Sequence, residues 1–154
     1  MMFEMCAKCL VVIGSSTNSM SMRHFFSYEQ RKKFIRMIYP EPFPIVGIPD
    51  YNSDEFWLSA LDDILLTVFG NSSTAPHRDL VFFGGCEEDV EFFIKSGRKI
   101  QLMNRFDGTT PKVSATEIRD DLLYGRSLEG KLPPIIIPSV QEEFKKNWEI
   151  FKRI

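Results

Sequence analysis

The 154-residue sequence has few cysteines and no large excess of charge of one sign, and each of these absences excludes a class of protein. Its three cysteines are an odd number in a chain long enough to build its own core, so we expect reduced thiols and no disulfide framework. The 19 basic and 21 acidic residues give a net charge of −2, which excludes a basic field that would hold nucleic acid or an acidic membrane. Any phosphate site must therefore be local.

Long apolar runs are also lacking. The longest, such as 9–13 and 135–137, are far shorter than the ~18 residues that would span a membrane. Glu4 and Lys8 interrupt the apolar N-terminus, so a secretory signal peptide is not expected. We therefore predict a cytoplasmic protein whose partners are small molecules and not nucleic acid or membrane; a homo-oligomer is compatible with these features.

The composition, 44% apolar and 26% charged, is that of a globular domain, and strand-like and helix-like stretches alternate along it. Short β-rich runs occupy 9–13, 43–48, 79–83 and 99–103. The first and third are continuous apolar runs, which are typical of strands buried on both faces. The sequence therefore predicts an α/β fold, one domain over 1–154, with helices on both faces of the sheet.

Capping signals mark where several helices start. Ser27, Ser114 and Ser139 are each followed three residues later by Gln or Glu, which is the spacing of a capping box. Another helix is predicted from Ser53 to Phe69, because acidic residues follow the serine and oppose the positive end of the helix dipole.

Two further helical segments are predicted. One lies between Cys86 and Gly97, and residues 1–8 look like the end of a helix. The last helix, over 138–154, is expected to pack through an apolar stripe against the rest of the domain, as a C-terminal bracing helix. The stripe consists of Val140, Phe144, Trp148, Phe151 and Ile154.

The stretch 113–119 has the most specific pattern. Ser114 and Thr116 put hydroxyl groups at the start of a helix, and Arg119 puts a guanidinium one turn further on. Together with the free amides of a helix N-terminus, these groups would form a phosphate cradle. An ordinary capped helix with a surface arginine has the same spacing, so both interpretations stay open.

This stretch resembles the Ile-Ser-x-Thr-x-x-Arg signature of the nucleotidylyltransferase superfamily, in its archaeal-type nicotinamide mononucleotide (NMN) adenylyltransferase form. Residues 12–15 resemble that family's second strand and Gly-Ser turn. Residues 24–31 resemble its Asn-Pro-Phe-Thr-x-x-Glu-Arg segment, although His24 and Phe25 replace Asn-Pro and Gln30 replaces the acidic residue. The resemblance implies a Rossmann-like fold with a mostly parallel sheet.

Further segments follow in the family's order. Pro49-Asp50 and Trp57 resemble its Pro-Asp segment and the tryptophan that stacks on the pyridine ring. Gly84-Gly85 resembles its turn after strand four, and Asn104-Arg105 lies upstream of the Ser-x-Thr-x-x-Arg motif. Collinearity over nearly the whole chain is stronger evidence than any of these pieces alone.

The resemblance implies transfer of AMP from ATP to NMN, which yields NAD and pyrophosphate. Ser114, Thr116 and Arg119 would bind the triphosphate, Arg119 would also act in catalysis, and Mg²⁺ would be carried by ATP. The implied NMN contacts are Gly14, Ser15, Asp50 and Trp57, and the other implied nucleotide contacts are Arg31, Gly84, Asn104 and Arg105.

Each of these roles has a simpler alternative. Trp57 lies on a helical pattern with Leu61 and would also suit a purely core position. Asp50 follows Pro49 and could serve only to form a turn, whereas Arg31 could be a solvated residue of a capped helix. Two other functions are also open: nucleotidyl transfer to another phosphorylated acceptor such as phosphopantetheine, and binding of nucleotide without catalysis.

The superfamily's His-x-Gly-His motif is absent, because neither His24 nor His77 is followed by Gly-His. The resemblance then implies that residues 1–8 end the family's first helix and that its first strand, central in the order 3-2-1-4-5, is missing. Three accounts are open: a start codon assigned too late, a deletion that leaves a non-catalytic relic, and a deletion compensated by another chain. The first is favoured because a lost central strand would expose unpaired edges.

A metal site is not predicted. Cys6 and Cys9 have a spacing at which two thiolates can share zinc, but structural zinc takes four ligands. The remaining candidates, Cys86, His24 and His77, are scattered through other segments. We expect the cysteines to be small buried apolar residues.

Overall fold

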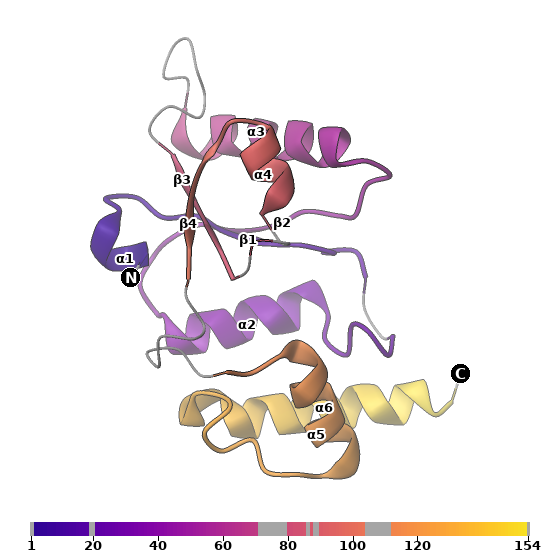
Figure 1. Ribbon diagram of the computed structural model, residues 1–154. Coiled ribbons are helices and arrows are strands. Elements are labelled where there is room, and N and C mark those ends of the chain that lie inside the picture. The colour runs from indigo at the N-terminus through magenta and orange to yellow at the C-terminus, as the bar shows by residue number, and fades with distance from the viewer. Residues whose placement is uncertain are drawn as a thin grey trace. The chain divides into compact units, whose positions relative to one another are not determined.

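The computed structural model describes residues 2–18, 21–70, 80–85, 87, 90–103 and 112–153. In this part of the chain, strands and helices alternate and the strands pair in parallel, which confirms the predicted α/β class (Figure 1). The strands form two separate two-stranded sheets, β1–β2 and β3–β4. No helix in the described ranges is long and apolar enough to cross a membrane.

The chain divides into two compact units. Residues 10–50 and 111–154 form the first, called the pocket unit. Residues 1–9 and 51–110 form the second, called the aromatic unit. The single domain predicted over 1–154 stays a prediction.

The sheet of the pocket unit pairs β1 (Val11–Ile13) with β2 (Ile45–Gly47), and Val12 lies opposite Val46. Helix α2 (Tyr28–Ile38) makes the crossover that a parallel pair requires and packs against β1. Both strands occur where the sequence predicts them, in shorter form. A small apolar cluster anchors the sheet, and its buried members are Ile13, Phe43 and Ile45.

The start of α2 is the complete capping box that its sequence predicts. The Ser27 hydroxyl accepts a hydrogen bond from the Gln30 N–H at 3.2 Å, and the Gln30 side chain accepts one from the Ser27 N–H at 3.0 Å. The box at α5 (Ala115–Tyr124) is only half formed. Ser114 caps that helix, whereas the Glu117 carboxylate pairs with Lys131 at 2.7 Å.

The C-terminal helix α6 (Ile137–Phe151) starts before the predicted Ser139. The 3₁₀ turn η1 (Pro134–Ile136) runs directly into α6, and Pro138, which has no N–H to lose, occupies the first turn. Ser139 therefore lies inside the helix, and Glu142 pairs with Lys146 at 2.7 Å instead of completing a cap. The predicted capping box at this position is wrong.

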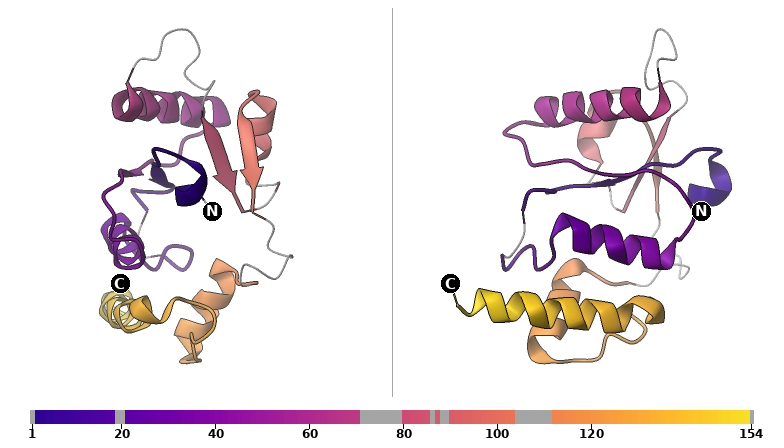
Figure 2. Two further views of the ribbon diagram at one scale, coloured as in Figure 1. Left: turned by 90° about the vertical axis from the view of Figure 1, so that its left-hand side faces the viewer. Right: turned by 180° about the vertical axis from the view of Figure 1, so that it is seen from behind.

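Helices α2 and α6 run alongside each other in opposite directions (Figures 1 and 2). The predicted stripe of α6 lies in this region: Val140 is buried, and the ring of Trp148 stacks on those of Phe144 and Phe151. Ile154, its last predicted member, lies outside the described residues. The buried residues of this larger core are Phe25, Phe34, Leu122, Leu128, Ile136 and Val140.

In its described residues, the aromatic unit contains the second sheet and three helices. Strand β3 (Val81–Gly84) pairs with β4 (Lys99–Leu102). Helix α3 (Asp54–Phe69) begins after Ser53, whose hydroxyl accepts from the Phe56 N–H at 3.3 Å, and ends before Gly70, as predicted. The short helices are α1 (Met2–Met5), where a helix end is predicted, and α4 (Glu91–Lys95), which packs beside β4.

The prediction that runs 9–13 and 79–83 are buried on both faces is wrong. In β1 only Ile13 is buried, and in β3 the side chain of Val81 is 41% exposed. Each strand has a single strand neighbour in the described part of the chain, so its side chains are covered only in part.

Candidate functional site

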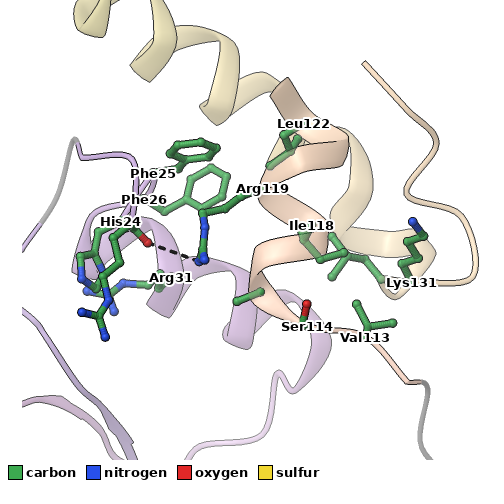
Figure 3. A pocket seen from close by; sticks show the side chains of 13 residues that line it. His24, Phe25, Phe26, Arg31, Val113, Ser114, Ile118, Arg119, Leu122 and Lys131 are labelled. Carbon is green, nitrogen blue, oxygen red and sulfur yellow. Dashed lines mark hydrogen bonds between the residues drawn. The ribbon is translucent and has the colours of Figure 1, made fainter. Parts of the chain in front are cut away.

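An open pocket of about 750 Å³ lies in the pocket unit, between the 23–26 segment, the first turn of α2 and the N-terminal half of α5 (Figure 3). Its volume falls in the range of small-molecule sites. The polar side chains that line it are Arg23, His24, Arg31, Ser114, Arg119 and Lys131. Apolar lining comes from Phe25, Phe26, Val113, Ile118, Leu122 and Leu132, together with Ala115.

The N-terminus of α5 forms one wall of this pocket. The Ser114 hydroxyl accepts a hydrogen bond from the Glu117 N–H at 3.1 Å, so it caps its own helix. Thr116 Oγ1 accepts from Nη2 of Arg119 at 2.8 Å, and this contact steadies the guanidinium. Arg119 also donates from Nη1 to the carbonyl oxygen of Arg23 at 3.4 Å, which is the dashed line in Figure 3.

Arg31 joins the pocket to the end of β1. Its Nη1 donates to the carbonyl oxygen of Gly14 and its Nη2 to that of Ser15, each at 2.8 Å. The space beside the Gly14 α-carbon is open, with no atom within 4 Å of the place where a side chain would start. Arg31 therefore braces the Gly-Ser turn while its guanidinium still lines the pocket.

Asp50 lies beside the same turn. Its carboxylate accepts from Ser15 Oγ at 2.8 Å and from Asn18 Nδ2 at 2.5 Å. Ser15 has a left-handed backbone with φ of 49°, which is uncommon for a residue other than glycine. The structure thus brings four predicted site residues, Gly14, Ser15, Arg31 and Asp50, into one hydrogen-bonded cluster.

His24 faces a cationic environment. Its pKa is lowered, mainly because burial disfavours the charged ring and then because Arg31 and Arg23 repel it, with a smaller effect from Arg119. Asp50 opposes this shift without reversing it. The imidazole is therefore neutral at pH 7, and its guanidinium neighbours carry the positive charge of this side of the pocket.

Lys131 lies on the far side of α5 from His24 (Figure 3) and has acidic partners. Its ammonium group contacts Glu117 at 2.7 Å and the buried carboxylate of Asp121 at 2.6 Å. Arg126 Nε donates to the other oxygen of Asp121 at 2.8 Å. These contacts tie the loop after α5 back onto the helix and neutralise Lys131. The other cations of the described lining are Arg23, Arg31 and Arg119, and Asp50 offsets part of the charge of Arg31.

Two predicted site residues lie in the described part of the aromatic unit. Trp57 of α3 makes edge-on contacts with Phe92 and Phe93, with ring centroids 5.5 and 6.0 Å apart. Gly84 ends β3, and its carbonyl oxygen accepts from the Met103 N–H at 2.9 Å. The predicted nucleotide contacts Asn104 and Arg105 lie outside the described residues.

The cysteines Cys6 and Cys9 are partly buried thiols. Burial raises the pKa of Cys9, and neighbouring Cys6 adds to the effect, so the protonated form is favoured at neutral pH. In the ranges that the structure describes, no three His, Cys, Asp or Glu residues gather in a group that could hold a metal ion. His77 and Cys86 lie outside those ranges.

Sequence reasoning missed several residues of this site. Arg23 has a weak signal, because it directly precedes His24 in the segment that resembles the family. Lys131 has none, since it lies in a loop with no motif around it. Gly47 of β2 is outside the pocket lining, but it has a usable signal for a close approach, because a glycine inside a strand pattern indicates one. A methyl group there would meet Ser16 at 2.6 Å and the Tyr28 ring at 2.9 Å.

Comparison with protein-family models finds none that matches the chain, and comparison with curated proteins finds no significant relative. The site must therefore be interpreted from its own chemistry. Guanidinium groups at a helix N-terminus, above an apolar wall, can bind an anionic ligand that also has an apolar or aromatic part.

Proposed function

We propose that this chain is a nucleotidylyltransferase that transfers AMP from ATP to NMN and forms NAD and pyrophosphate. The observation that carries the proposal is the convergence of two predicted motifs on one pocket. Arg31 and Arg119 are far apart in the sequence, yet both line it, beside the N-terminus of α5. A polyphosphate is the ligand class that such a set of cations and helix amides accommodates best.

The reaction needs little more from the protein than positioning and charge stabilisation. An oxygen of the NMN phosphate attacks the α-phosphorus of ATP, the bond from that phosphorus to the bridging oxygen breaks, and pyrophosphate leaves. Arg119, held by Thr116, would stabilise the negative charge of the triphosphate. No Asp or Glu is among the described lining residues, so Mg²⁺ would enter bound to ATP as part of the substrate.

The strand pairing supports the same proposal. In the resembled order 3-2-1-4-5, strands two and three are neighbours and so are strands four and five. If β1 and β2 correspond to the first pair and β3 and β4 to the second, both observed pairs agree with this order. Parallel pairing within each sheet also agrees with it.

A second candidate function is transfer to a different phosphorylated acceptor. The contacts of Trp57 favour it, because an indole packed edge-on against Phe92 and Phe93 serves equally well as a core residue. In that case Trp57 would have no role in recognising a pyridine ring. The pocket at the N-terminus of α5 would still bind the phosphates of the nucleotide.

The test is calorimetric titration of ATP·Mg²⁺ and then NMN into the chain, with pyrophosphate release measured in parallel. We expect both ligands to bind and pyrophosphate to form. R119A should weaken ATP binding roughly ten- to hundredfold, because a hydrogen bond to a charged group contributes about 1.5–3 kcal/mol. K145A, which removes one positive charge from α6 outside the pocket, is the control and should bind like the wild type.

Each other outcome has a definite meaning. ATP binding without pyrophosphate release would favour a non-catalytic nucleotide-binding protein. Pyrophosphate release with another phosphorylated acceptor and not with NMN would favour the second candidate. Failure to bind ATP, or equal binding by the wild type and R119A, would overturn the proposal.

A further inference from the structure

Asn147 of α6 contacts the 23–26 segment, which lines the pocket, without lining the pocket itself. It is a buried polar residue, only 8% exposed, on a helix that contributes no lining side chain among the described residues. Its Nδ2 donates to the carbonyl oxygen of Phe25 at 2.6 Å. A buried carbonyl without a hydrogen-bond partner costs free energy of folding. This bond therefore fixes the position of the 23–26 segment relative to α6.

The same amide is paired with the cap of α2. Asn147 Nδ2 donates to Gln30 Oε1 at 2.8 Å, and Gln30 Nε2 donates back to Asn147 Oδ1 at 3.2 Å. Gln30 Oε1 is also the acceptor for the Ser27 N–H in the capping box. Asn147 therefore holds the residues just before α2, and it shares the first turn of α2 with Glu143, whose carboxylate accepts from Gln30 Nε2 at 2.8 Å.

The segment held in this way supplies a large part of the pocket. Residues 23–26 all line it, and Arg31 follows one turn into α2. On the pocket side, the contact to this segment is the 3.4 Å bond from Arg119 to the Arg23 carbonyl, which is long and exposed. The bond from Asn147 to the Phe25 carbonyl is shorter, at 2.6 Å, and buried, so it anchors the segment more firmly than the Arg119 contact does.

We propose that Asn147 is a positioning residue of the anion pocket: by binding the Phe25 carbonyl and the Gln30 amide, it places the cationic 23–31 segment opposite Arg119. The inference rests on the proposed function, because it takes the pocket as the binding site for the phosphates of a nucleotide. It assigns α6 a role in binding beyond that of a terminal brace.

Two variants and one control test this role with inorganic tripolyphosphate as the probe. N147L removes the donor and keeps the approximate size, and N147D places a carboxylate against two oxygen acceptors, Phe25 O and Gln30 Oε1. The control K33Q removes another contact between α2 and α6, the Lys33–Glu143 ion pair at 3.0 Å, and leaves in place both the 23–26 segment and the separate hydrogen bond from Gln30 Nε2 to Glu143 at 2.8 Å. Titrations at 0.15 M salt limit the effect of the lost surface charge.

We expect N147L and N147D to bind tripolyphosphate about tenfold more weakly than the wild type, because small displacements of positioning groups have effects of this size or larger. K33Q should bind like the wild type. Wild-type affinity in a folded N147L variant would overturn the inference.

A measurement on the wild type covers the case in which both Asn147 variants fail to fold. Coupling between two sites is reciprocal, so tripolyphosphate should slow exchange of the Asn147 side-chain amide hydrogens with solvent. Unchanged exchange at saturating tripolyphosphate would overturn the positioning role and leave the proposed function standing. If the wild type does not bind tripolyphosphate at all, the proposed function fails together with the inference.

Discussion

The hydroxyl of Ser15 donates a 2.8 Å hydrogen bond to the carboxylate of Asp50, although 35 residues separate the two in sequence. Ser15 follows the end of β1 and Asp50 follows the end of β2, so the bond joins the carboxyl ends of two parallel strands. This is the edge at which open α/β sheets bind ligands. The contact also helps to hold the left-handed backbone of Ser15, a conformation that costs about 1 kcal/mol or more.

Anion binding should raise the pKa of His24. Burial and the charges of Arg31, Arg23 and Arg119 lower this pKa, and a bound tripolyphosphate would neutralise those charges. The imidazole ¹H signals report the titration by NMR. The sequence has one other histidine, so the His77→Gln variant assigns them.

Two substitutions should move the same pKa in opposite directions. R23M should raise the pKa of His24 because it removes a repelling charge, and D50N should lower it because Asp50 favours the protonated ring. If the pKa of His24 stays constant while tripolyphosphate saturates the protein, the anion binds elsewhere.

Gly47 should tolerate a methyl group far less well than Gly14. At Gly47 the added carbon would meet Ser16 Cβ at 2.6 Å and the Tyr28 ring at 2.9 Å, whereas at Gly14 nothing lies within 4 Å. We expect G47A to lower the free energy of unfolding by about 1–3 kcal/mol, as other overpacked sites do. Urea unfolding of G47A and G14A compares the two, and equal losses would contradict the close approach of Tyr28 to β2.

Ser27 should be a cap and Ser139 should not. S27A removes the acceptor for the Gln30 N–H at the start of α2 and should cost about 1 kcal/mol of stability. S139A changes a residue inside α6 and should stay within about 0.5 kcal/mol of the wild type. A larger loss for S139A than for S27A in chemical denaturation would restore the predicted helix start at Ser139.

Asp121 should contribute stability that depends on pH. A hydrogen bond from Lys131 is the main reason why its pKa is lowered, and Arg126 adds to the shift against the opposing effect of burial. The pKa of Asp121 in the folded protein lies below its ordinary value of 3.8. The ionised carboxylate therefore stabilises the fold fully above pH 3.8, and this stabilisation is lost as the pH falls below 3.8 and through the folded pKa.

D121N should therefore melt roughly 5 °C below the wild type at pH 7, since it breaks a buried ion pair, and the difference should shrink towards pH 3. D120N, at the neighbouring position of α5, is the control and should change little. A D121N deficit that is the same at pH 7 and pH 3 would show that the loss is one of packing and not of charge.

Trp57 should distinguish the two proposed acceptors. If its indole stacks on the pyridine ring of NMN, W57A should weaken NMN binding and leave ATP binding unchanged in calorimetric titrations. F56A, at the exposed neighbouring position of α3, is the control for a lost aromatic ring. Equal loss of both ligands, or of folding, would identify Trp57 as a core residue held by Phe92 and Phe93.

Local patterns in the sequence were sufficient for most of the secondary structure. The cap at Ser27 and the helix that follows Ser53 depend on hydrogen bonds within one turn, so nearby residues determine them. The start of α6 could not be placed in this way, because the turn Pro134–Ile136 continues into the helix and overrides the signal at Ser139.

The sequence by itself determined the α/β class, the approximate positions of the strands and the helix start capped by Ser114, since each follows from short-range periodicity or spacing. Only the tertiary structure decided which distant residues meet. Arg119 donates to the Arg23 carbonyl, Lys131 is neutralised by Asp121, and Asn147 donates to the Phe25 carbonyl. These contacts join residues that are distant along the chain, and their energies depend on burial and on distances that no local pattern contains.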